Sequence, residues 1–178
     1  MEQHFEILKL KPGASIEDVK DDFASGKPMN RMLQGDVGSG KTMVAFLSAL
    51  MAIESGFQVA LMAPTEILAT QHFHAITEML KDMNLKVDLL TGSVKIKKRR
   101  EIHKNLEDGT LHILIGTHAL LEDKVKFHNL GIAVIDEQHR FGVAQRSKMW
   151  QKNELPPHIL VMTATPIPRT LAMSVYGD

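Results

Sequence analysis

From about residue 30 onward, short runs rich in valine, isoleucine and leucine alternate with longer segments of helical period. Six such runs predict β-strands, at residues 31–34, 58–63, 86–90, 112–116, 132–135 and 158–162. Apolar residues three or four positions apart predict connecting helices at 42–54, 66–82, 97–107 and 143–152. Several runs are apolar almost throughout, as expected of strands covered on both faces. The pattern therefore predicts an α/β fold with a mostly parallel sheet and helices on both faces.

The first 26 residues follow a different pattern. KPGAS at 11–15 predicts a turn, and residues 16–23 predict a helix whose N-terminus Ser15 would cap. We therefore divide the chain into an N-terminal appendage or entry helix, residues 1–26, and one globular domain, residues 27–178. A length of 178 residues with 44% hydrophobic content is enough for a single core.

Charge and composition limit the possible partners. Lysine and arginine total 21, as do aspartate and glutamate, so no overall positive field attracts nucleic acid and any contact with DNA must be local. The absence of cysteine excludes disulfides and thiolate metal sites. The sequence contains no H-E-x-x-H pair, and His72 and His74 would point to opposite sides of a helix, so we expect no zinc site. Neither a secretory signal nor a membrane-spanning stretch is evident, and we expect a cytoplasmic protein with no membrane partner.

A glycine-rich motif, G-x-x-x-x-G-K-[ST], follows the first predicted strand and precedes a predicted helix. It is formed by Gly35, Asp36, Val37, Gly38, Ser39, Gly40, Lys41 and Thr42. Glycines let successive backbone N–H groups turn towards phosphate oxygens, and the following helix adds its positive end. Lys41 is expected over the β- and γ-phosphates, and the Thr42 hydroxyl is expected to join the Mg²⁺ shell. A chance glycine-rich turn is the alternative, but the flanking strand and helix favour a nucleoside triphosphate site.

Two carboxylates, Asp136 and Glu137, directly follow the strand predicted at 132–135. Parallel sheets bind ligands at this end of their strands. Asp136 is expected to hold Mg²⁺ and Glu137 to orient or deprotonate the attacking water, while Gln138 and His139 would sense the γ-phosphate. An acidic pair alone is just as typical of a solvated strand end. The upstream phosphate loop favours the catalytic interpretation, because a Mg²⁺-nucleotide needs a carboxylate partner.

These motifs belong to a longer series that resembles RecG-like DNA helicases of superfamily 2. Over about residues 21–178 the chain shows, in the RecG order, PMNRMLQGDVGSGKT, APTEILATQH, TGSVK, GTHALL, DEQHRFGVAQR and MTATPIPRTLAMSVYGD. The transcription-repair coupling factor shares GDVGSGKT and TATPIPRTL but resembles the chain less well at DEQHRFGVAQR. The resemblance implies a RecA-like lobe that uses ATP and Mg²⁺ to remodel branched or forked DNA.

The resemblance also implies roles for further residues. Contacts with the DNA backbone would come from Pro64, Thr65, Thr91, Gly92, Ser93, Thr117 and His118. Coupling between the γ-phosphate site and the DNA would involve Thr163, Ala164 and Thr165, together with residues 141–146, including Gln145 and Arg146. Each of the threonines alone is more typical of plain turn chemistry, but they follow separate strands of one parallel sheet, so their loops can converge.

Two departures from the family change the expected activity. LKLKPGAS at 8–15 lacks the glutamine with which relatives read adenine, so we expect weak base selectivity. The chain stops at Asp178, before a second RecA-like lobe and its arginine fingers, so we expect slow hydrolysis and no helicase activity from this lobe alone. The alternative is a truncated or fused module that binds nucleotide or DNA without turnover. A GTPase is excluded because no asparagine-lysine-x-aspartate motif is present.

A basic cluster at residues 95–104 offers a second place where DNA could bind. It contains Lys95, Lys97, Lys98, Arg99, Arg100 and Lys104. A run of this kind usually forms the solvated face of a helix. We favour the solvated face over a DNA-binding site.

Overall fold

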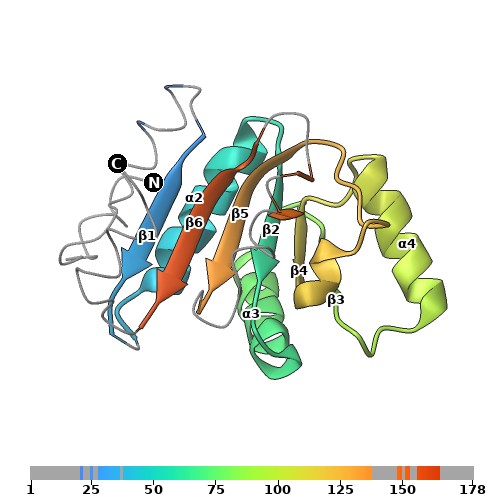
Figure 1. The fold of residues 1–178 in the computed structure, drawn as a ribbon, viewed down its shortest axis with the longest axis horizontal. Helices are drawn as coiled ribbons and strands as arrows, with labels where there is room; N and C mark the ends of the chain where they lie inside the picture. The colour runs from blue at the N-terminus through green and yellow to red at the C-terminus, as the bar shows by residue number, and fades with distance from the viewer. Residues whose placement is uncertain are drawn as a thin grey trace.

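A computed structural model of the chain describes residues 21, 25, 28–36, 38–137, 148–149, 151–152 and 156–164. Within them, six parallel strands form one sheet in the order β1-β6-β5-β2-β4-β3 (Figure 1). The strands are β1 (Asn30–Gln34), β2 (Gln58–Met62), β3 (Val87–Leu90), β4 (Ile113–Gly116), β5 (Leu130–Asp136) and β6 (His158–Thr163). All six predicted strands are confirmed, with ends that differ by one or two residues.

Among the described residues, three complete helices and one short 3₁₀ helix connect these strands. They are α2 (Lys41–Glu54), α3 (Glu66–Met79), α4 (Ile96–Glu107) and η2 (His118–Leu121), of which η2 was not predicted. The predicted end of α3 at residue 82 was wrong, because Leu80 is buried and its carbonyl accepts a hydrogen bond from Met83 N–H, which closes a turn there. The helices predicted at 16–23 and 143–152 lie largely outside the described residues.

Alternate residues of β2, β4, β5 and β6 pack into two separate cores, one on each face of the sheet. Val59 and Leu61 of β2 belong to the core that α2 and α3 cover. Ala60 and Met62 belong to the core that contains Ile102 of α4 together with η2. Because both faces are covered, both sets of positions must be apolar, which explains the continuous apolar runs. The predicted α/β fold with helices on both faces is confirmed.

The parallel arrangement brings the candidate site segments that the structure describes to one edge of the sheet. The phosphate loop follows β1, and the acidic pair lies at the end of β5. The segments expected to contact DNA follow β2, β3 and β4, which are neighbours in the sheet. In Figure 1 the arrowheads of β1, β6 and β5 point to this edge. In the part of the chain that the structure describes, no helix is both long and apolar enough to cross a membrane.

Close packing at the end of β4 gives a stability prediction. A Cβ atom added to Gly116 would lie 2.0 Å from the Leu90 carbonyl oxygen and 2.2 Å from Leu120 Cδ1. Since the backbone of β3 must shift to make room, Gly116→Ala is expected to lower the free energy of unfolding by about 3 kcal/mol. Urea denaturation measures this change. Gly92→Ala is the control, because its Cβ would meet only the Glu66 side chain at 3.3 Å; equal losses for the two variants would contradict the packing argument.

Candidate functional site

The loop after β1 curls back over the N-terminus of α2. Gly38 and Gly40 have φ angles of 80° and 86°, in the left-handed region that glycine adopts without strain. Gly40 is the N-cap of α2, and its carbonyl accepts hydrogen bonds from Met43 and Val44 N–H groups. A Cβ on Gly35 would lie 2.5 Å from Ser39 Oγ, so the loop also closes tightly at its start. The glycine positions of the motif therefore match the backbone shape that they predict; Val37 lies outside the described residues.

The Lys41 ammonium lies against this loop. Its Nζ donates hydrogen bonds to the carbonyl oxygens of Gly35, at 2.5 Å, and Asp36, at 2.7 Å. Ser39 Oγ is 3.5 Å away. Thr42 follows in the first turn of α2 and is half-buried. A cation and a hydroxyl thus stand together at the positive end of a 14-residue helix, where an anion is stabilised.

Strand β6 holds the phosphate loop and the acidic pair side by side. Gly35 N–H donates to the Thr163 carbonyl at 3.3 Å, and Glu137 N–H donates to the Met162 carbonyl at 2.8 Å. In the register of the sheet, Met162 pairs with Leu33 of β1 on one side and with Asp136 of β5 on the other. Two strand spacings, about 10 Å, therefore separate Asp136 from Leu33, which lies two residues before the loop begins at Gly35. Lys41 and Asp136 lie at the same edge of the sheet.

Asp136 is buried at the end of β5 and has a histidine partner. Its residue exposure is 9%, and its Oδ2 lies 2.7 Å from His72 Nε2 of α3. Sequence reasoning assigned no role to His72, which lies 64 positions earlier in the chain. No local pattern in the sequence could have revealed this contact, because it depends on how α3 packs beside β5.

Glu137 leaves the strand in an unusual backbone conformation. Its φ of 50° makes it the single non-glycine residue with positive φ in the part of the chain that the structure describes. A side chain in this region is strained, and such strain occurs preferentially at functional positions. Glu137 Oε1 accepts a hydrogen bond from Ala164 N–H at 3.2 Å. The second carboxylate is therefore joined directly to the segment that follows β6.

The hydrogen bond between Ala164 and Glu137 involves one of the residues expected to couple the nucleotide site to the DNA. Thr163 is fully buried at the end of β6, and Ala164 is half-buried beside Glu137. The other predicted sensing and coupling residues lie outside the described part of the chain: Gln138, His139, Gln145, Arg146 and Thr165.

The loops expected to contact DNA are bonded to one another. Thr65 Oγ1 caps α3 by accepting Leu68 N–H at 3.2 Å. The Glu66 carboxylate accepts hydrogen bonds from Ser93 N–H at 3.2 Å and from Ser93 Oγ at 3.0 Å. These hydrogen bonds therefore join the loop after β2 to the loop after β3, although the two residues are 27 positions apart in the sequence. The predicted convergence of these loops at one edge is seen in the structure.

Burial separates the predicted DNA contacts into two groups. Thr65, Ser93 and His118 are exposed, as is Gly92, and Pro64 is half-buried. The residues Thr91 and Thr117 are each only 3% exposed. Thr91 Oγ1 is hydrogen-bonded to Ser93 Oγ at 3.0 Å, and Thr117 Oγ1 has no hydrogen-bond partner among the described residues. Only the first group presents its side chains or backbone to a ligand at the surface.

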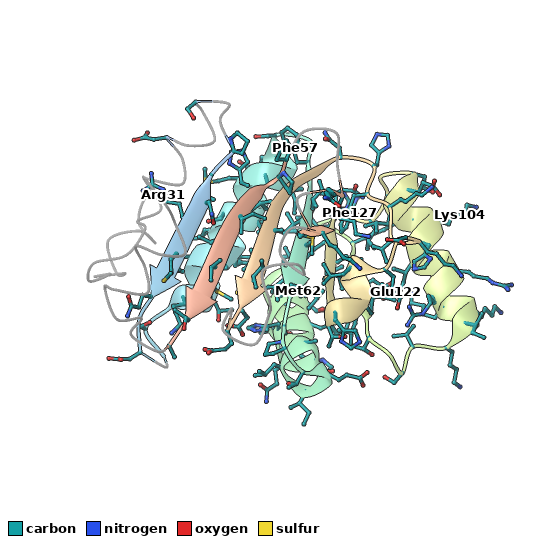
Figure 2. All side chains as sticks on the ribbon, viewed as in Figure 1. Arg31, Phe57, Met62, Lys104, Glu122 and Phe127 are labelled. Atoms are coloured by element: carbon teal, nitrogen blue, oxygen red, sulfur yellow. The ribbon has the colours of Figure 1, made fainter. Side chains whose placement is uncertain are left out.

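The basic helix α4 is partly used in structural ion pairs. Lys98 Nζ lies 2.7 Å from Asp88 Oδ2, and this hydrogen bond raises the pKa of Lys98 despite partial desolvation. Arg99 pairs with Glu122 at 2.9 Å and also donates to the Thr91 carbonyl at 2.9 Å. The remaining basic residues of the cluster are exposed: Lys95, Lys97, Arg100 and Lys104 (Lys104 and Glu122 are labelled in Figure 2). The arrangement agrees with a solvated helix face whose Arg99 supports the loop after β3.

The donor set fits Mg²⁺ bound together with a nucleotide. Among the described residues no group of three or more His, Cys, Asp or Glu side chains could hold a metal ion. Mg²⁺ does not need one, since it usually keeps several waters and binds through one or two carboxylates plus substrate phosphates. Asp136, whose side chain is 12% exposed, supplies such a carboxylate, and Thr42 supplies a hydroxyl at the phosphate loop. These two residues suit a Mg²⁺ ion that arrives with its nucleotide.

Comparison with known proteins agrees with the geometry. An "ATP-dependent DNA helicase RecG" from Aquifex aeolicus is 56% identical over 175 residues, which cover 98% of this chain and 22% of the relative. The RecG from Synechocystis is 53% identical over 92% of this chain and 20% of its own length. A solved structure of RecG bound to a three-way DNA junction is 41% identical, with a TM-score of 0.79, over 99% of this chain and 24% of that one. The resemblance to RecG and the RecA-like fold are thus confirmed, and the chain spans about a fifth to a quarter of these relatives.

A family match covers both the candidate nucleotide site and the loops expected to contact DNA. The sequence profile of the DEAD/DEAH box helicases matches residues 16–174. This range contains the phosphate loop, the acidic pair at the end of β5 and the three loops that follow β2, β3 and β4. The chain therefore belongs to the DEAD/DEAH box helicase family.

Proposed function

We propose that the chain is the ATP-binding motor lobe of a RecG-like DNA helicase, which couples hydrolysis of Mg²⁺-ATP to the remodelling of branched DNA. One observation carries the nucleotide part: successive residues of β6, Met162 and Thr163, hold the acidic pair and the phosphate loop next to each other. The names of the relatives support the choice of ATP and DNA as substrates. The relatives named above are bacterial, and bacterial DNA lies in the cytoplasm, so we propose that the motor acts there.

In this proposal the phosphate loop and Lys41 bind the triphosphate. Backbone N–H groups at the start of α2 point to the phosphate oxygens, and Lys41 Nζ exchanges the carbonyls of Gly35 and Asp36 for oxygens of the β- and γ-phosphates. Thr42 and Asp136 hold Mg²⁺, which when bound neutralises charge that develops on the phosphates. These roles follow from the charges of the two side chains. The Lys41 ammonium can bind phosphate directly, whereas the Asp136 carboxylate can do so only through a cation.

Glu137 is the proposed general base. Its carboxylate orients the attacking water and accepts its proton as the water approaches the γ-phosphorus. The hydrogen bond from Ala164 N–H holds Glu137 and makes the segment after β6 sensitive to any movement of that carboxylate. By the resemblance, Gln138 and His139 would sense the γ-phosphate, and Thr165 would help to link that site to the DNA. Gln145 and Arg146 would carry the nucleotide signal outward.

The proposed DNA contacts lie at the loops after β2, β3 and β4. A relative has been solved on a three-way DNA junction, which makes branched DNA the expected partner. Short hydroxyl and backbone donors suit contacts with the sugar-phosphate backbone. Thr65, Gly92, Ser93 and His118 are the exposed members, whereas Thr91 and Thr117 act through their positions under the surface. DNA phosphate competes with the Glu66 carboxylate for the two donors of Ser93.

A negative charge at this surface gives a prediction for DNA binding. Ser93→Asp is expected to weaken binding of a fluorescent three-way junction by about tenfold or more, because a carboxylate replaces a donor and repels phosphate. Fluorescence anisotropy at low salt measures the affinity. Asn84→Asp, which adds the same charge on an exposed residue beyond the other end of α3, is the matched control. Equal effects of the two substitutions would show that the loss reflects net charge rather than a contact at Ser93.

The proposed function is tested first with the unaltered chain. Calorimetric titration with ATP is expected to show binding that strengthens when Mg²⁺ is present, and absence of any ATP binding would overturn the proposal. A sensitive phosphate-release assay with and without junction DNA then separates the two alternatives. Release of phosphate, faster with DNA, supports the motor lobe, whereas binding without any turnover supports a non-catalytic nucleotide-binding module.

A further inference from the structure

The contact between His72 and Asp136 joins helix α3 to the carboxylate that is proposed to bind Mg²⁺. His72 Nε2 lies 2.7 Å from Asp136 Oδ2, and the two side chains are 13% and 12% exposed. An ionised carboxylate only accepts hydrogen bonds, so the imidazole N–H donates. A carboxylate withdrawn from water to this extent requires a partner to remain stable in its charged form. The contact is therefore a specific, largely desolvated hydrogen bond and not a chance encounter at the surface.

The geometry of the bond leaves the carboxylate able to bind a metal. His72 engages Oδ2, and a carboxylate has a second oxygen, Oδ1, that can face a cation. Fixing one oxygen restricts rotation of the Asp136 side chain and thereby fixes the direction of the other. Carboxylates that bind metals are commonly held in this way by a neighbouring hydrogen-bonding group, and loss of that group typically lowers metal affinity or activity by about 10- to 100-fold.

Helix α3 connects this bond to the proposed DNA surface. Thr65 caps α3, Glu66 begins it and binds Ser93, and His72 lies two turns further along the same helix. Along the helix, Glu66 and His72 are separated by about 9 Å. A shift of the whole helix at its N-terminus would therefore also move His72 relative to Asp136.

We propose that His72 is a positioning residue, which orients Asp136 for Mg²⁺ and links the metal site to the DNA surface through α3. The proposal rests on the proposed function, because it assigns Mg²⁺-nucleotide to the edge of the sheet where Asp136 lies. The proposal adds His72, which lies outside the phosphate loop and the acidic pair, to the residues that support the Mg²⁺-nucleotide site. His72 touches neither nucleotide nor water in this scheme and acts only through the Asp136 carboxylate.

The test compares three variants of two histidines on one helix. His72→Ala removes the donor, whereas His72→Gln retains an N–H at nearly the same reach. His74→Ala, two residues away on α3, is the matched control, because His74 is exposed and has no contact with Asp136. Calorimetry of ATP binding over a Mg²⁺ series gives two quantities for each variant: the Mg²⁺ concentration at half-maximal effect and the ATP affinity without metal.

His72→Ala is expected to raise the Mg²⁺ requirement by about 10- to 100-fold, with ATP affinity in the absence of metal unchanged. A purely structural role would instead raise the Mg²⁺ requirement and lower the ATP affinity without metal together. The Mg²⁺ requirement of His72→Gln should lie within about threefold of that of the original protein. The Mg²⁺ requirement of His74→Ala should equal that of the original protein. If His72→Ala does not fold, His72→Asn serves instead, because its amide is too short to reach Asp136 and the same metal defect is expected.

The outcomes separate this inference from the proposed function. An unchanged Mg²⁺ requirement in a folded His72→Ala or His72→Asn variant would overturn the role of His72 while leaving ATP binding intact. Failure of His72→Gln to restore Mg²⁺ binding would also overturn it. Failure of the unaltered chain to bind ATP would instead remove the proposed function, whatever the histidine variants do.

Discussion

Lys41→Ala is expected to weaken binding of Mg²⁺-ATP by about 100-fold or more. Hydrogen bonds to a charged group contribute about 1.5–3 kcal/mol each, and Lys41 is proposed to make at least two of them to phosphate oxygens. Fold stability should change little, because the loop carbonyls that Lys41 contacts, those of Gly35 and Asp36, can bond to water instead. The substitution therefore tests the ligand contact rather than the fold.

Isothermal calorimetry measures the effect of Lys41→Ala directly. Lys104→Ala is the control, because it removes one positive charge from an exposed position on α4, away from the phosphate loop. Its affinity for Mg²⁺-ATP should equal that of the unaltered chain. If the two variants bind ATP equally well, the phosphate-loop assignment is wrong.

Glu137→Gln is expected to slow ATP hydrolysis by about 100-fold or more while leaving the Kd for Mg²⁺-ATP within about threefold. General bases contribute about 10²- to 10⁴-fold to rate. Glutamine has the same shape, and its amide oxygen can still accept the hydrogen bond from Ala164 N–H. The change thus removes the basic oxygen with little effect on the contact that holds the side chain.

Single-turnover release of labelled phosphate measures the rate, since it detects hydrolysis by a slow enzyme. Glu107→Gln, at the exposed end of α4, is a control for the loss of one carboxylate. Hydrolysis by Glu137→Gln at the original rate would remove Glu137 as the base. Together the two substitutions separate nucleotide binding from hydrolysis. Lys41→Ala should weaken binding of Mg²⁺-ATP, whereas Glu137→Gln should slow only its hydrolysis.

The positions of the strands could be predicted from the sequence because they depend on local composition. Runs such as 132–135 are apolar at every position, and only a strand buried on both faces tolerates this. The phosphate loop was equally readable, since Gly38 and Gly40 occupy left-handed positions that glycine favours. Once the strands are parallel, their carboxyl ends must share an edge, and the convergence of Lys41 with Asp136 follows from the same local information.

The contacts that link these segments could not be read from the sequence. His72 meets Asp136 across 64 residues, and Glu66 meets Ser93 across 27. The resemblance pointed equally to Ser93, Thr91 and Thr117 as DNA contacts, yet only Ser93 is exposed. The sequence by itself determined which segments become strands, loops and the edge of the site, because those depend on neighbours along the chain. Tertiary structure alone decided which side chains meet and which are covered, because packing of helices against a sheet sets distances between residues that are remote in sequence.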